Sequence, residues 1–98
     1  MQSWSVYLVQ TADGKLYCGV STDVKRRFAE HCSGNARAAK ALRGRGPLQL
    51  VYHFQAQSKR SAMQLEYRLK RLPKSRKQAL VEGHWQLSEL EQQLLELT

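Results

Sequence analysis

The sequence predicts an α+β domain in which a three-stranded antiparallel sheet is flanked by helices, in the order β-β-α-β-α-α with a further C-terminal helix. Short runs rich in β-branched and aromatic residues alternate with stretches of helical apolar periodicity. Gly and Pro residues stand at the boundaries between these segments. A chain of 98 residues suits one hydrophobic core. We therefore expect one domain over 1–85, and a helix over 86–98 that packs on it or extends it.

The first two segments predict a β-hairpin. Residues 4–9 and 15–20 have strand composition, and residues 11–14 read Thr-Ala-Asp-Gly, which is typical of a turn. If Gly14 adopts a left-handed conformation in a three-residue loop, the register of the whole hairpin is fixed.

That register decides where the two tyrosines of the hairpin point. Tyr7 lies opposite Gly19, and Val9 lies opposite Tyr17, so the two tyrosine rings share one face as diagonal neighbours. Gly19 leaves open space beside Tyr7. A slip of one residue would send the rings to opposite faces.

A helix is predicted over 24–32, capped by the Ser-Thr-Asp run at 21–23. Arg27 and His31 lie four residues apart and border its apolar stripe, whereas Arg26 faces water. The stripe itself consists of Val24, Phe28 and Cys32.

The Gly-, Ala- and Arg-rich segment 33–47 predicts a mobile basic loop with one helical turn within 36–42. Residues 48–56 predict a third strand. Its alternation puts one set of apolar side chains on one side of the strand: Leu48, Leu50, Tyr52 and Phe54.

The remainder of the chain predicts three helices. The first runs from a Ser58 cap to about residue 72 and the second from Pro73 to about residue 82. The last covers about 88–97, with Ser88 and Glu91 as a capping box. Its leucines at 87, 90, 94 and 97 form a stripe that suits packing on the same domain.

The charge distribution predicts an anionic partner. All Lys and Arg residues lie between Lys15 and Lys77, where there are three acids, whereas 78–98 contains four Glu residues and no base. Such clustering is typical of nucleic-acid-binding domains, although a solubilising surface or an acidic protein partner would fit as well. The expected nucleic-acid-binding residues are Lys25, Arg26, Arg37, Lys40, Arg43, Arg45, Lys70, Lys74 and Lys77.

Neither a bilayer-spanning apolar stretch nor a signal-peptide pattern is present, so we expect no membrane association and a cytoplasmic protein. The two cysteines, Cys18 and Cys32, are then reduced, and we expect both to be buried thiols. A zinc site with His31 and His53 matches no common ligand spacing.

Five residues that border the core could form a site for metal-assisted phosphodiester cleavage: Tyr7, Tyr17, Arg27, His31 and Glu66. A carboxylate suits Mg²⁺ or Mn²⁺, a guanidinium suits a phosphate, and a phenol can orient or deprotonate water if cations lower its pKa of about 10. Each residue also has an ordinary structural interpretation, such as ring packing or a surface ion pair of Glu66 with Lys70.

The tyrosine triplets strengthen the chemical interpretation. Ser5-Val6-Tyr7 and, ten residues later, Tyr17-Cys18-Gly19 resemble the two motifs that name the GIY-YIG nuclease superfamily. The run from Tyr17 to His31 resembles that family's hairpin-to-helix segment, with its functional Arg and, four residues on, His. The resemblance covers about residues 3–82 and is closest to the small stand-alone bacterial members.

The resemblance implies a role for each residue. Tyr7 would be the general base, Tyr17 would position water or phosphate, and Arg27 would stabilise charge. His31 would be an accessory acid/base or phosphate ligand, and Glu66 would hold one divalent ion, Mg²⁺ or Mn²⁺. The departures are Ser5 for the family's first Gly, Cys18 for the usual Ile, and only Lys77 or Gln78 (in place of the usual Asn) as the later polar residue.

These observations predict a divalent-metal-dependent endonuclease that hydrolyses DNA in repair or recombination. The alternative is a non-catalytic DNA- or RNA-binding module that uses the same basic surface. A third interpretation is a protein-interaction domain that docks through its acidic C-terminal helix.

Overall fold

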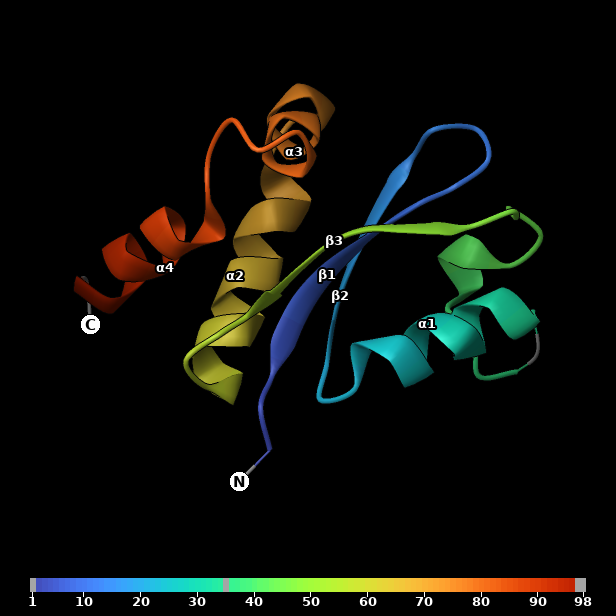
Figure 1. Ribbon diagram of the computed structural model, residues 1–98, viewed down its shortest axis with the longest axis horizontal. Coiled ribbons are helices and arrows are strands. Elements are labelled where there is room, and N and C mark those ends of the chain that lie inside the picture. Colours follow the sequence, from blue (N-terminus) through green and yellow to red (C-terminus); the bar gives the residue numbers. More distant parts are fainter. Residues whose placement is uncertain (1, 35, 97–98) are drawn as a thin grey trace.

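The computed structural model describes residues 2–34 and 36–96 and has the predicted α+β architecture (Figure 1). The strands cross the centre of the molecule, with α1 on one side and α2, α3 and α4 on the other. The elements are β1 (Ser5–Gln10), β2 (Leu16–Ser21), α1 (Val24–Ser33), the 3₁₀ turn η1 (Lys40–Leu42), β3 (Gln49–Gln55), α2 (Lys59–Arg71), α3 (Lys74–Val81) and α4 (Leu87–Glu96).

The sheet is antiparallel with strand order β2-β1-β3, so β2 is an edge strand. The predicted hairpin register is confirmed: Tyr7 pairs with Gly19, and Val9 pairs with Tyr17. Gly14 has φ 85°, the left-handed value that the turn requires. The two tyrosines therefore share one face of the sheet.

Two small cores lie on opposite faces of β1, because its successive side chains alternate. Val6 and Leu8 face α2 and pack with Leu65 and other α2 side chains. Tyr7 and Val9 face the side that carries α1 and pack with Leu42 of η1 and with partly buried α1 residues. The central strand is thus buried on both sides.

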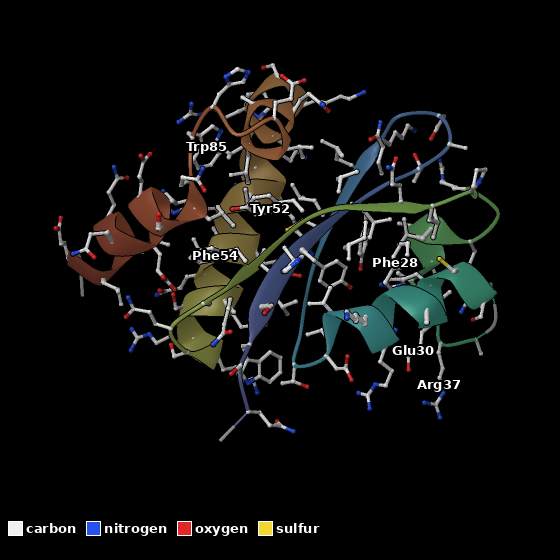
Figure 2. All side chains as sticks on the ribbon, viewed as in Figure 1. Phe28, Glu30, Arg37, Tyr52, Phe54 and Trp85 are labelled. Carbon is white, nitrogen blue, oxygen red and sulfur yellow. The ribbon has the colours of Figure 1, made fainter. Side chains whose placement is uncertain are left out.

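The expectation that β3 presents one apolar face is wrong. Leu8 pairs with Tyr52, but Val9 pairs with Leu50, which leaves Val51 as the extra residue of a β-bulge. Leu50 therefore packs in the Tyr7 core, whereas Tyr52 packs in the α2 core. In Figure 2, Tyr52 and Phe54 lie on the α2 side, and Phe28 lies on α1.

The segment 36–47, for which composition predicts a mobile basic loop, makes several contacts within itself and with the rest of the domain. Arg43 donates hydrogen bonds to the carbonyls of Ala36 (2.9 Å) and Ala38 (3.3 Å). Leu42 is buried, and the Arg45 carbonyl accepts from the Ala12 amide at 3.0 Å. A buried leucine, arginine contacts and a backbone hydrogen bond thus connect this segment to the domain.

The last helix packs on α2 through Leu87 and Leu94, whereas Leu97 lies outside the described residues. The predicted capping box of Ser88 and Glu91 is wrong. The buried Glu91 carboxylate instead accepts from the Gln57 amide at 2.8 Å and from the Ser61 hydroxyl, at the start of α2. Glu91 thus joins α4 to the domain. Among the described residues, no helix is long and apolar enough to cross a membrane.

Candidate active site at the edge of the sheet

The hairpin buries Tyr7 on the face that carries α1. The side chain is 1% exposed, and its ring lies directly over Gly19. A Cβ atom on Gly19 would come within 2.5 Å of the Tyr7 hydroxyl oxygen and 2.6 Å of Cζ. Glycine is therefore required at position 19 for steric reasons.

Helix α1 brings His31 to the same place. Its Nε2 atom lies 2.9 Å from the Tyr7 hydroxyl oxygen, and its side chain is 1% exposed. His31 is thus deeply buried, whereas the sequence predicted that it would border the apolar stripe of the helix. Cys32, which was expected in the buried stripe, is exposed instead.

The backbone fixes the tautomer of His31. The Ala39 amide donates to Nδ1 at 3.2 Å, so Nδ1 carries no proton and the neutral ring is protonated at Nε2. The Nε2–H group therefore donates to the Tyr7 oxygen. In this arrangement His31 cannot accept a proton from Tyr7, but it can stabilise negative charge on the Tyr7 oxygen.

Burial dominates the electrostatics of this pair. Burial and then the charge of Arg27 lower the pKa of His31 below its ordinary value of 6.5, which keeps the ring neutral. Burial and then the nearby Tyr17 phenol raise the pKa of Tyr7 well above its ordinary value. The charge of Arg27 and a hydrogen bond from its side chain oppose that rise only in part. Tyr7 is therefore a protonated phenol at neutral pH.

Arg27 is held by acceptors on two sides. Its Nη1 atom donates to the Glu30 carboxylate at 3.0 Å and to the Arg37 carbonyl at 2.6 Å. Glu30 also pairs with the Arg37 guanidinium at 3.7 Å, and Figure 2 shows these two residues together beside α1. Arg27 thus has a defined position while its side chain keeps partial exposure. Arg26 is exposed, as predicted.

Tyr17 is half-buried and more open to solvent than Tyr7, and its ring packs edge-on against His31 with centroids 5.6 Å apart. Beside it lies a pocket of about 280 Å³ that includes Lys15 and Arg45 in its lining. Lys15 was not among the predicted phosphate-binding residues. Strand alternation could have identified it, because Lys15 lies two residues before Tyr17 and so projects from the same face.

Glu66 lies on the other side of the edge strand from the tyrosines. Its carboxylate, 18% exposed, pairs with Lys70 at 3.4 Å. Burial and then the nearby Glu66 carboxylate raise the pKa of Cys18 to about 12. Cys18 lies between Tyr17 and Gly19 in β2, and its side chain points to the opposite face, where it packs with α2. Glu66, which belongs to α2, is therefore on the opposite face of this strand from the Tyr17 ring. Tyr7 and Tyr17 thus both contact His31, with Arg27 close to Tyr7, whereas Glu66 comes from α2, which packs on the other face of the sheet.

The side chains that could bind a metal suit only an ion that takes few ligands from the protein. Among residues 2–34 and 36–96, no three His, Cys, Asp or Glu side chains are grouped to hold a metal. The considered zinc site is therefore not formed, and Cys18 and Cys32 are not equivalent, since one is buried and the other exposed. A single partly exposed carboxylate fits Mg²⁺ or Mn²⁺, which keep several water ligands.

The predicted basic residues flank β2 in two groups. On the α1 side, Arg37, Arg43 and Arg45 engage acceptors of the protein itself, whereas exposed Lys25, Arg26 and Lys40 take part in no ion pair with the described carboxylates. On the α2 side lie Lys70 and Lys77, whose charges act on Cys18. Lys74 extends towards the hairpin turn, and its Nζ atom lies 3.7 Å from the point where a side chain at position 14 would begin.

Comparison with known families decides the classification. The family model described as the GIY-YIG catalytic domain matches residues 3–79. The chain belongs to the GIY-YIG catalytic-domain family. This match spans every element from β1 to most of α3, and it confirms the resemblance that the tyrosine triplets indicate.

The relatives of this GIY-YIG domain are small proteins. A UPF0213 protein of Vibrio cholerae serotype O1 is 55% identical over 89 residues, covering 90% of this chain and 86% of its own length. A UPF0213 protein of Yersinia pestis is 51% identical over 78 residues, or 80% of each chain. The solution NMR structure of a UPF0213 protein from Bacillus halodurans is 42% identical and has a TM-score of 0.53, covering 82% of this chain and 83% of that one. Family membership supports a nuclease-type function with a nucleic acid as substrate.

Proposed function

We propose that the protein is a divalent-metal-dependent endonuclease that hydrolyses DNA phosphodiester bonds along the free edge of β2. One observation carries the proposal. The β1–β2 hairpin has Tyr7 and Tyr17 on one face, next to the fixed Arg27 of α1, whereas Glu66 of α2 lies on the other face. A DNA backbone laid along an edge strand can be approached from both faces. The basic residues on either side of β2 would neutralise the flanking phosphates.

Exposure supports an exchange of the roles that the resemblance implies for the two tyrosines. Tyr17 is the more exposed phenol and adjoins the pocket of Lys15 and Arg45, so we assign it the contact with the attacking water or the phosphate. Tyr7 is buried and protonated, so we assign it a positioning role. It is the acceptor of the His31 Nε2–H group and the packing partner of Gly19.

The other groups act on charge. Arg27 presents a guanidinium whose position is set by Glu30 and the Arg37 carbonyl, and it would stabilise the charge that develops on the phosphate oxygens. Glu66 would hold the divalent ion, which supplies Lewis-acid assistance when bound. Lys70 already compensates the charge of this carboxylate and would separate from it when the ion binds.

Incubation of the purified protein with supercoiled plasmid, single-stranded DNA, branched DNA and RNA, each with Mg²⁺, Mn²⁺ or a chelator, tests this function. We expect metal-dependent cleavage of DNA that falls by about 100-fold or more in Glu66→Gln and in Tyr17→Phe, and by less in Tyr7→Phe. Glu82→Gln is the matched control, because Glu82 is an exposed carboxylate that pairs with His84. Its activity should equal that of the wild type.

The same assay addresses the alternative, a binding module without hydrolytic activity. Salt-sensitive DNA binding without cleavage in any metal would contradict the nuclease proposal and favour that module. Cleavage that is unaffected by Glu66→Gln would reject the role of Glu66 and indicate a different centre. A preference for RNA would reject DNA as the substrate.

A further inference from the structure

The outer face of α2 forms a groove with α4 that the proposed active site does not use. Its volume is about 410 Å³, and its lining consists of Arg60, Met63, Gln64, Tyr67, Arg68 and Leu94. The two most exposed large apolar side chains of the described residues line it: Tyr67 at 57% and Met63 at 45%. Apolar side chains gathered in this way mark interaction surfaces.

The α2 side of this groove carries positive charge that the protein leaves uncompensated. Within residues 2–34 and 36–96, no carboxylate lies within 4.0 Å of the guanidinium of Arg60, Arg68 or Arg71. Arg71 instead stacks on Tyr67, with 4.5 Å between its Cζ atom and the ring centroid. Arg27 and Arg45, by contrast, both pair with carboxylates. The α2 wall is therefore suited to an anionic partner.

The α4 side of the groove lining is apolar, because Leu94 is the residue that α4 contributes to it. A nucleic acid carries phosphates along its whole length and would bring them against the apolar Met63 and Leu94. A peptide helix can confine its acidic side chains to one flank and its apolar side chains to another. The arrangement of arginines beside apolar side chains therefore favours a peptide helix.

We propose that the α2–α4 groove binds an amphipathic helix of another protein. The apolar face of this helix would cover Met63, Tyr67 and Leu94, and its acidic flank would face Arg60 and Arg68. Tyr, Met and Arg are the residue types that protein interfaces favour, and insertion of a helix into a groove is a common mode of recognition. The groove faces away from the sheet, because Ala62, Leu65 and Leu69 form the side of α2 that packs inwards. The partner would thus leave the edge of β2 free.

A charge-exchange experiment tests this proposal without any assay of cleavage. The probe is a synthetic helical peptide of about 18 residues, with leucines on one face and glutamates on one flank, and a second peptide carries lysines in place of the glutamates. Binding is followed by fluorescence anisotropy and by amide chemical shifts of the full chain. The wild type should bind the glutamate peptide, with shifts centred on Tyr67 and Leu94. Arg60→Glu/Arg68→Glu should bind it about tenfold less tightly and should bind the lysine peptide instead.

Two controls separate docking from misfolding. Arg76→Glu, on α3, should leave peptide binding unchanged, since Arg76 stacks on Trp85 away from the groove. Tyr67→Ser should abolish binding of the glutamate peptide without lowering the unfolding temperature, because Tyr67 is exposed. The proposal is overturned if the shifts map outside the groove or if charge reversal has no effect. It is equally overturned if single-stranded DNA of about 12 nucleotides binds these residues more tightly, or if the protein alone dimerises through them.

Discussion

The two faces of strand β2 are built differently. On the face that carries α1, two groups have fixed partners: the Ala39 amide and Tyr7 hold His31, and Glu30 and the Arg37 carbonyl hold Arg27. On the other face, Glu66 has one partly exposed ion pair with Lys70. The first face is organised before a substrate arrives, whereas the second keeps its carboxylate accessible. Such a division suits a site that orients a phosphate with one face and recruits an ion with the other.

The largest expected effect comes from a change of geometry on the organised face with retention of charge. Arg27→Lys keeps the positive charge but removes the planar guanidinium, whose Nη1 atom contacts both Glu30 and the Arg37 carbonyl. We expect the rate of DNA cleavage to fall by about 100-fold. The control is Arg26→Lys, because Arg26 is the exposed neighbour of Arg27. Equal rates for the two variants would show that Arg27 acts only through its charge.

Gly19→Ala tests whether the same face tolerates any added volume. The new Cβ would lie 2.5 Å from the Tyr7 hydroxyl oxygen, so the ring must move and its contact with His31 must break. We expect the free energy of unfolding to fall by about 1–3 kcal/mol in urea denaturation. Gly46→Ala is the matched control, because the nearest atom to its Cβ lies 3.8 Å away. A Gly19→Ala variant as stable as that control would refute the fitted packing.

The buried His31 makes the organised face sensitive to acid. Its pKa is lowered in the folded state, so the unfolded chain takes up the proton first as the pH falls below 6.5. Its contribution to stability is complete above 6.5 and is lost towards the lower folded-state pKa. Unfolding free energies at about pH 7.5 and 5.5 should therefore differ less in His31→Gln than in the wild type. His53→Gln, at an exposed histidine, should retain the wild-type difference. If His31→Gln retains it too, the ring is not buried in its neutral form.

The smallest expected effect is a difference in chemical labelling between the two cysteines, of which Cys18 lies on the α2 face of β2. Cys18 is buried with a pKa of about 12, whereas Cys32 is exposed. A thiol reagent at neutral pH should label Cys32 in the native protein and leave Cys18 unlabelled until denaturant is added. Cys32→Ser should then show no labelling of the native state. Rapid labelling of that variant would mean that the packing around Cys18 opens readily.

Local sequence rules predict the hairpin and the helices well. The turn at Gly14 fixes the register that pairs Tyr7 with Gly19, because a left-handed residue at that position allows one loop geometry. The Ser58 cap is also confirmed, since its hydroxyl oxygen accepts from the Ser61 amide at 3.0 Å. These features depend on residues close together in the chain.

The features that were not predicted depend on contacts between residues that are distant in the sequence. The bulge at Val51 lets Leu50 and Tyr52 pack in two different cores. Glu91 accepts hydrogen bonds at the start of α2 and does not cap its own helix. The depth of His31 depends on the segment that supplies the Ala39 amide. The Gly- and Arg-rich composition of that segment does not show that Arg43 donates hydrogen bonds to carbonyls within it.

The central claim is that both faces of β2 serve one reaction. A double-mutant cycle of Tyr17→Phe and Glu66→Gln, measured as the rate of metal-dependent plasmid cleavage, tests it directly. Groups that act together on one step lose most of their effect at the first substitution, so the double variant should be about as slow as the slower single variant. Losses that multiply in the double variant, or a single variant that cleaves at the wild-type rate, would show that the two faces do not form one site.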